Sequence, residues 1–162
     1  MADFEWDVRF MKLAHHIAHW SKERGRRVGA VIVGPDKEVR STGYNGFPRG
    51  VNDLVEQRHD RASGQKYFWS SHAERNAVYN AARVGIPLVG CSIYVPWFPC
   101  GDCAKAIIQT GMRELIAYQP DFADPKWGRD FRLVAEMLGE AGVKVRYMDR
   151  LEPTLDGNSS GE

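Results

Sequence analysis

The sequence predicts an α/β fold of three layers, in which helices cover both faces of a mixed five-stranded sheet. Two observations support this prediction. Short apolar segments typical of strands recur along the chain, and from the third one onward they alternate with segments of helical periodicity. The intervening helices are long enough to connect parallel neighbours by right-handed crossovers, so the last strands are expected to run parallel.

The N-terminal part of the chain is predicted to form a helix followed by a hairpin. Apolar side chains recur at helical spacing within residues 4–23, and Gly25 is expected to end this helix. Residues 28–33 are almost all apolar, as in a strand buried on both faces. A turn at 34–37 then leads to a returning strand at 38–42.

The segment 43–70 is predicted to be a long loop, and loops of that length are usually functional or disordered. The elements expected after it are helices at 72–83, 100–110 and 129–140, and strands at 91–95, 114–118 and 143–147. Residues 1–150 are therefore expected to form a single domain. The polar, Gly- and Ser-rich tail at 151–162 has little to bury and is predicted to be disordered.

Composition excludes several classes of function. The chain has 162 residues and a formal net charge of +1, whereas proteins that grip a nucleic-acid backbone usually carry a strongly basic surface. Nucleic acid is therefore not expected as a partner, and a small-molecule substrate fits better. No apolar run approaches the roughly 20 residues that span a bilayer, and the acidic N-terminus differs from a signal peptide. A cytoplasmic protein without a membrane partner is expected.

Two short motifs predict a metal centre. They are Ser71-His72-Ala73-Glu74 and Pro99-Cys100-Gly101-Asp102-Cys103. Catalytic zinc takes three protein ligands and leaves its fourth position to water, and His72, Cys100 and Cys103 would supply these ligands. Glu74 is separated from the histidine by one residue and is expected to be the catalytic proton carrier.

Each motif also has a structural interpretation. Ser71 and Glu74 could form a capping box at the start of a helix. Cys100 and Cys103 could be small buried hydrophobic residues or a redox pair. Both motifs stand at predicted helix N-termini, whose amides stabilise thiolate, so zinc explains them together better than capping and packing do separately. A non-catalytic zinc-stabilised interaction domain is the alternative from a different class, but structural zinc normally takes four protein ligands.

The two motifs resemble those of the cytidine and deoxycytidylate deaminase family. Further segments that carry this resemblance are Ser21-Lys22, Val28-Gly29-Ala30-Val31-Ile32-Val33 and Gly43-Tyr44-Asn45-Gly46-Phe47-Pro48. The last of these indicates the deoxycytidylate branch. The resemblance implies a cytidine-deaminase-like fold, a Zn²⁺ cofactor and hydrolytic deamination of a cytosine nucleotide, above all dCMP, with release of ammonia.

The resemblance also implies roles for residues at matching positions. Asn45 is expected to hydrogen-bond the sugar of the substrate, while the backbone amide of Ala73 and the carbonyl of Phe98 are expected to bind the edges of its ring. Ser21 and Lys22 match a stretch that is expected to lie near the nucleotide phosphate. Family members are usually homo-oligomers, so a hexamer or a dimer is expected.

Two residues depart from the family pattern. Arg75 follows Glu74 at a position where an uncharged residue is common, and Trp97 stands where smaller residues are common. A guanidinium and an indole near the mouth of the site would change what enters it. The alternative substrate is therefore another amino-heterocycle, such as a cytosine nucleoside, a free base or a purine-like ring. Editing of tRNA or single-stranded DNA is disfavoured by the near-neutral charge.

Overall fold

The structure is a computed structural model that describes residues 2–151. The predicted tail at 151–162 lies outside these residues except for Leu151. Within the described range, no helix combines the length and the apolar character needed to cross a membrane.

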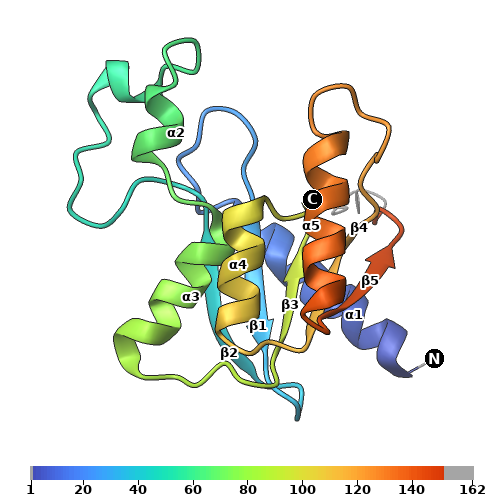
Figure 1. Ribbon diagram of the computed structural model, residues 1–162. Helices are drawn as coiled ribbons and strands as arrows, with labels where there is room; N and C mark the ends of the chain where they lie inside the picture. The colour runs from blue at the N-terminus through green and yellow to red at the C-terminus, as the bar shows by residue number, and fades with distance from the viewer. Residues whose placement is uncertain (1, 152–162) are drawn as a thin grey trace, which may run out of the picture.

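Figure 1 shows a single sheet in which the strands follow the order β2-β1-β3-β4-β5. The strands are β1 (Gly29–Val33), β2 (Val39–Tyr44), β3 (Ser92–Val95), β4 (Glu114–Tyr118) and β5 (Lys144–Met148). Strand β1 pairs antiparallel with both β2 and β3, whereas β3, β4 and β5 are parallel. The prediction of a mixed five-stranded sheet with parallel last strands is therefore confirmed.

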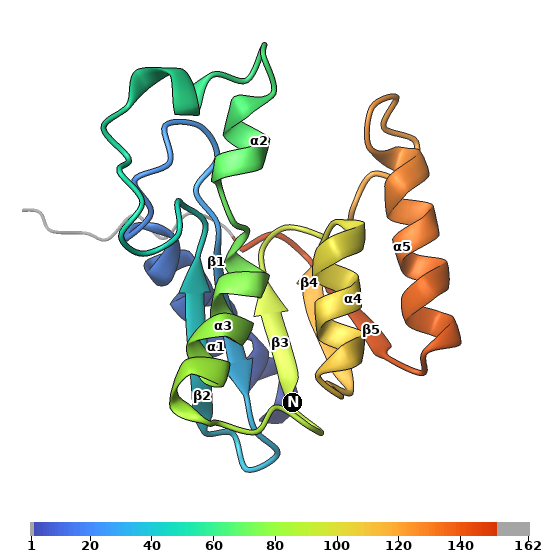
Figure 2. The ribbon, with the colours of Figure 1, turned by 60° about the vertical axis from the view of Figure 1, so that its left-hand side comes forward.

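Helices lie on both faces of the sheet, as the three-layer prediction requires. Helix α1 (Ala2–Ala18) covers one face, and α3 (Ala73–Val84), α4 (Gly101–Gln109) and α5 (Gly128–Glu140) cover the other (Figure 1, Figure 2). Side chains of β1 alternate between these layers: Ala30 and Ile32 pack with residues of α3, while Val31 and Val33 pack with residues of α1. All of β1 is buried, as expected of a strand covered on both faces.

Helix α1 is shorter than predicted, because it ends at Ala18 rather than at residue 23. The amides of His19, Trp20 and Ser21 bond the carbonyl three residues earlier, which is the tight geometry of a closing helical turn. Glu23 then turns inward and pairs with Lys66. A tertiary contact therefore overrides the helical pattern at this point.

Residues 45–70, called the excursion below, contain two short helices that the sequence did not predict. They are η1 (Glu56–His59) and α2 (Gln65–Trp69), and neither contains a buried residue. Without a buried face, these helices leave no hydrophobic periodicity in the sequence. Figure 2 shows the excursion above the end of the sheet at which β2 and β3 terminate.

Helices α3 and α4 begin at this same end of the sheet. Strands β2 and β3 lie on either side of β1 and both run antiparallel to it, so their carboxyl ends lie at the same end of the sheet. Helix α4 begins shortly after β3, and α3 begins where the excursion returns to the sheet and Ser71 pairs with Gly46. Open α/β sheets bind their ligands beyond the carboxyl ends of the strands.

Helix α3 packs closely on β2 because residue 43 is a glycine. A Cβ atom on Gly43 would lie 2.3 Å from the backbone nitrogen of Ala77 and 2.4 Å from the backbone oxygen of Ala73. Nearby, the Ser41 hydroxyl donates a hydrogen bond to the Ala77 carbonyl at 2.6 Å. Gly43 therefore sets how deeply the first turns of α3 sit on the sheet.

Candidate active site and metal centre

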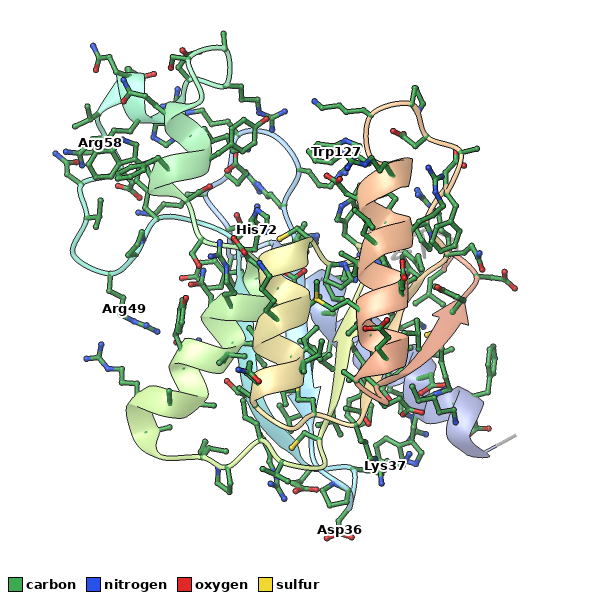
Figure 3. All side chains as sticks on the ribbon, viewed as in Figure 1. Asp36, Lys37, Arg49, Arg58, His72 and Trp127 are labelled. Atoms are coloured by element: carbon green, nitrogen blue, oxygen red, sulfur yellow. The ribbon has the colours of Figure 1, made fainter. Side chains whose placement is uncertain are left out.

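The structure brings His72, Cys100 and Cys103 together where α3 and α4 begin. Figure 3 labels His72 at this point. His72 is the N-cap residue of α3, and Cys100 is the N-cap residue of α4. His72 Nδ1 lies 3.3 Å from Cys100 Sγ and 3.5 Å from Cys103 Sγ. Tetrahedral zinc at ordinary bond lengths separates a nitrogen ligand from a sulfur ligand by about 3.6 Å. The three donors are therefore placed for a metal ion.

The electrostatics of this centre favour the thiolate form of Cys100, whereas the pKa of Cys103 is raised by its hydrogen bond with Cys100 and by burial. Hydrogen bonds from the Cys103 thiol and from His72 lower the pKa of Cys100 to about 3. The N-terminus of α4 further favours negative charge at this position. Thiolate is the form of cysteine that binds metals, and two sulfurs with one imidazole suit zinc.

Glu74 lies in the first turn of α3, two residues after His72, and is only 4% exposed. Burial raises the pKa of its carboxyl group above the ordinary value, although its own backbone amide and His72 act in the opposite direction. The capping-box interpretation is wrong. The N-cap residue is His72, and the buried hydroxyl of Ser71 has no hydrogen-bond partner among the described residues.

A cavity of about 640 Å³ opens above His72, Cys100 and Glu74. Its walls come from both sides of the metal donors: the excursion contributes Tyr67, and the start of α5 contributes Trp127. Figure 3 shows the same arrangement, with His72 between the excursion and Trp127. A bound molecule can therefore reach the donors and the buried carboxyl group at once.

Three of the predicted substrate-binding residues, Asn45, Ala73 and Phe98, line this cavity. Ala73 is the first residue of α3, where a backbone N–H has no acceptor within the helix. Ser21 and Lys22 are not among the described residues that line it. The buried Ser21 donates its hydroxyl hydrogen to the Asn45 carbonyl at 2.7 Å, and Lys22 pairs with Asp53 at 2.9 Å. Their contact with a phosphate stays a prediction.

The side chain of Asn45 fixes the backbone just before β1. Its Oδ1 atom accepts a hydrogen bond from the amide of Val28 at 2.8 Å, and its Nδ2 atom donates one to the carbonyl of Arg26 at 2.9 Å. The amide group has a second hydrogen with which it can donate to a bound molecule. Asn45 therefore also holds Arg26 in the cavity wall.

Basic side chains line the cavity, and no sequence signal predicted them. They are Arg26, Arg61, Lys66, Lys105 and Lys126, and they outnumber the lining carboxylates of Glu74 and Asp130. Four separate segments supply these cations, so only the folded chain brings them together. The sequence pattern that could have been noticed is the basic run Arg24-Gly25-Arg26-Arg27, which ends just before β1.

The two residues that depart from the family pattern lie in different places. Trp97 stands in the cavity wall, and the Arg26 guanidinium lies 3.5 Å from the centroid of its ring. Arg75 is not among the described residues that line the cavity. Its buried Nε atom has no hydrogen-bond partner anywhere in the described part of the chain. Trp97 is therefore the departure that bears on what enters the cavity.

Zinc-dependent nucleobase deaminases place a glutamate beside one ion held by histidine and cysteine, and this chain is an enzyme of that class. The family model described as "Cytidine and deoxycytidylate deaminase zinc-binding region" matches residues 4–119, so the chain belongs to that family. Its cofactor is Zn²⁺, as the family and the donor set both indicate. The predicted enzyme class and cofactor are confirmed.

Relatives extend the similarity over most of the chain. A protein described as "Uncharacterized deaminase in luxG 3'region" from Aliivibrio fischeri is 37% identical over 146 residues, which cover 89% of this chain and 94% of that protein. The deoxycytidylate deaminase of Homo sapiens is 38% identical over 138 residues, which cover 83% of this chain and 76% of that protein.

A solved structure shares the fold. The dCMP deaminase of the cyanophage S-TIM5, crystallised in complex with dCMP and dUMP, superposes with a TM-score of 0.68 at 24% identity. The superposition covers 89% of this chain and 97% of that chain. At this identity the likeness shows the fold alone, and it confirms the predicted cytidine-deaminase-like architecture.

Proposed function

We propose that this enzyme deaminates a cytosine nucleotide, converting dCMP to dUMP with release of ammonia. In this proposal His72, Cys100 and Cys103 hold the zinc, and Glu74 carries protons. The observation that supports it most is the buried Glu74 carboxyl group beside three metal donors, under a cavity rich in cations. The deoxycytidylate deaminase among the relatives supports the same substrate class.

The reaction replaces the amino group of the cytosine ring by a carbonyl oxygen that comes from water. Bound zinc supplies a Lewis acid that makes water a nucleophile near neutral pH. Glu74 accepts a proton from the attacking water and gives it to the ring nitrogen; it then accepts the second proton from the hydroxyl group now on the ring carbon and passes it to the departing amine as the C–N bond breaks. One hydrogen of water thus ends on the ring nitrogen and the other in ammonia.

Fixed groups around the cavity would orient the ring and the sugar. The backbone amide of Ala73 and the carbonyl of Phe98 belong to buried residues next to the metal donors, so they can hold the ring edges with little movement. Asn45 lies further along the cavity wall, where its second amide hydrogen can reach a sugar hydroxyl.

The phosphate would bind at the cations near the excursion. Arg26 and Arg61 both line the cavity, and burial together with the like charges of Arg150 and Arg61 lowers the pKa of Arg26. Lys66 lines the same cavity. Cations gathered in this way are stabilised by a bound anion, and a phosphate monoester offers several acceptor oxygens for charge-assisted hydrogen bonds.

The proposal is tested by measuring ammonia release from a panel of cytosine and purine bases, nucleosides and nucleotides. The zinc-loaded protein should show its highest kcat/KM with dCMP, lose activity on chelation and regain it with zinc. A higher kcat/KM with an unphosphorylated ring than with dCMP would mean that the substrate is another amino-heterocycle and not a nucleotide. A zinc-loaded protein that is inert toward the whole panel would instead point to a non-catalytic zinc domain.

We further propose, from the family resemblance, a homo-oligomer located in the cytoplasm. Both statements stay predictions. Light scattering of the purified protein would test the first, and a monomer at micromolar concentration would contradict it.

A further inference from the structure

Three consecutive residues before β1 each form an ion pair with the excursion. Lys22 pairs with Asp53 at 2.9 Å, Glu23 with Lys66 at 2.9 Å, and Arg24 with Glu56 at 2.6 Å. The charges at 22–24 alternate in sign, and each meets its opposite in the excursion. This part of the chain therefore holds the excursion beside the cavity.

The three ion pairs differ in burial. The Arg24 and Glu56 side chains are 55% and 69% exposed, and that of Lys22 is 82% exposed, so solvent screens the two outer pairs. Glu23 and Lys66 are only 7% and 12% exposed. A buried charge that loses its partner is strongly destabilised, so the Glu23–Lys66 pair is the one that fixes the geometry.

Glu23 also lies beside a second cation. Its carboxylate accepts a hydrogen bond from the amide of Gly25 at 3.2 Å, and Arg61 interacts electrostatically with it. The Arg61 guanidinium covers Gly25 so closely that a Cβ atom there would lie 1.8 Å from it. Lys66 and Arg61 line the active-site cavity, whereas Glu23 is not among its described lining residues.

We propose that Glu23 is a positioning residue, whose buried carboxylate holds Lys66 at the cavity wall beside Arg61 so that these cations bind the phosphate of the substrate. Lys66 pairs with this carboxylate and the Arg61 guanidinium lies against Gly25, two residues further on, so two cations gather near one carboxylate and keep an excess of positive charge for an anion. The inference rests on the proposed function, because it needs a phosphorylated substrate. It adds a residue that acts through others and touches neither the zinc nor the ring.

The main test compares dCMP with deoxycytidine as substrates of Glu23→Gln, which keeps the size of the side chain and removes its charge. The ratio of kcat/KM for dCMP over that for deoxycytidine should fall about tenfold, since hydrogen bonds to charged groups contribute on this scale. The fall should appear in KM for dCMP, with kcat changed less than about twofold. The matched control is Glu56→Gln, which breaks an exposed pair of the same set and should leave the ratio within about twofold.

A double-mutant cycle separates positioning from general destabilisation. Lys66→Met should lower the same ratio, and adding Glu23→Gln to it should lower the ratio by less than about twofold more, because Glu23 would have lost a main group through which it acts. Glu23→Asp, which keeps the charge, should restore part of the ratio. If Glu23→Gln does not fold, Lys66→Met and Glu23→Asp decide the question on their own.

Binding of inorganic phosphate, followed by tryptophan fluorescence because Trp97 lies in the cavity wall, gives a readout that needs no turnover. Glu23→Gln should weaken it about tenfold and Glu56→Gln should not. Equal ratios and equal phosphate affinities for Glu23→Gln and Glu56→Gln overturn the inference. Failure of the unsubstituted protein to deaminate any nucleotide overturns the proposed function instead. The phosphate affinity of Glu23→Gln relative to the unsubstituted protein then still tests the role of Glu23.

Discussion

At the scale of single residues, Glu74 joins two properties that a proton carrier needs. It is buried beside the metal donors, and the first turn of α3 fixes its position relative to His72. Since the capping role is excluded, the Glu74 carboxyl group is not required to begin the helix. Its removal should therefore affect chemistry more than folding.

We predict that Glu74→Gln keeps its fold and its zinc but loses turnover by at least about 100-fold, because the amide cannot accept and return a proton. Ammonia release and metal content by atomic absorption measure the two effects. Glu136→Gln, on the exposed side of α5, is the control and should retain full turnover. Turnover of Glu74→Gln within a few-fold of the unsubstituted enzyme would remove Glu74 from the mechanism.

For single residues, the sequence predicted which metal donors lie together, but it did not predict the basic side chains of the cavity wall. The donors could be recognised because the key residues of each motif stand two or three positions apart, and the structure brings both motifs to one point. Arg61 and Lys66 could not be recognised. They lie in a segment without periodicity, and their partners are distant in sequence, because Lys66 pairs with Glu23 and Arg61 lies against Gly25.

At the scale of elements, the close approach of α3 to β2 decides where the metal donors lie. The first turns of α3 rest on Gly43, and the same helix begins with His72 and Glu74. Any side chain at position 43 meets backbone atoms of α3, which cannot move aside as a flexible side chain can. The separation of α3 from the sheet thus controls the geometry of the centre.

We predict that Gly43→Ala lowers the free energy of unfolding by about 1–3 kcal/mol, the usual effect of overpacking, and also weakens zinc binding. Urea unfolding and competition with a chelator measure these changes. Gly139→Ala is the matched control, because a Cβ atom there meets nothing within 4 Å. It should raise stability by up to about 1 kcal/mol, as expected for alanine in a helix. Normal zinc affinity in Gly43→Ala would contradict the argument.

The elements themselves were predicted where hydrophobic packing decides them. The strand expected at 114–118 is found there. The helix expected at 100–110 differs from α4 by one residue at each end, and the helix expected at 129–140 differs from α5 by one residue at its start. The end of α1 and the two short helices of the excursion were missed. Polar contacts determine both, and such contacts leave no periodic pattern in the sequence.

At the scale of the whole molecule, an ionic cluster joins α1 to the sheet. Arg146 on β5 donates hydrogen bonds to Asp7 on α1 and to Glu114 on β4, and Tyr94 on β3 donates one to Asp7 at 2.8 Å. Burial alone would raise the pKa of Glu114, but Arg146 and Lys144 reverse this and lower it. The folded protein therefore favours the charged form of Glu114.

From the lowered pKa of Glu114, we predict that it stabilises the fold at neutral pH and that this contribution is lost as pH falls below about 4.5. Glu114→Gln should be less stable than the unsubstituted protein at pH 7, and the difference should narrow on acidification. Urea unfolding at several pH values measures it. The exposed Glu140→Gln should change stability by less than about 0.5 kcal/mol at every pH. A pH-independent difference for Glu114→Gln would contradict the prediction.

The overall architecture was predictable as a class, but its strand order was not. Alternating strands and helices require parallel neighbours, and this placed β3, β4 and β5 correctly. The antiparallel pairing of β1 with β3 has no local signal, because the connection runs through the whole excursion and α3. Contacts between distant segments, rather than local propensity, settle this part of the fold.

The cavity is built from two parts of the chain, the helices on the sheet and the excursion. The zinc donors and Glu74 stand on helices anchored to the sheet, whereas Arg61, Lys66 and Tyr67 belong to the excursion and reach the cavity from outside the core. Replacing residues 45–70 by the corresponding segment of a relative would exchange the cavity-lining side chains of the excursion. It would leave the metal donors and Glu74 in place. Evolution and protein engineering can both use this segment to change which compounds are accepted.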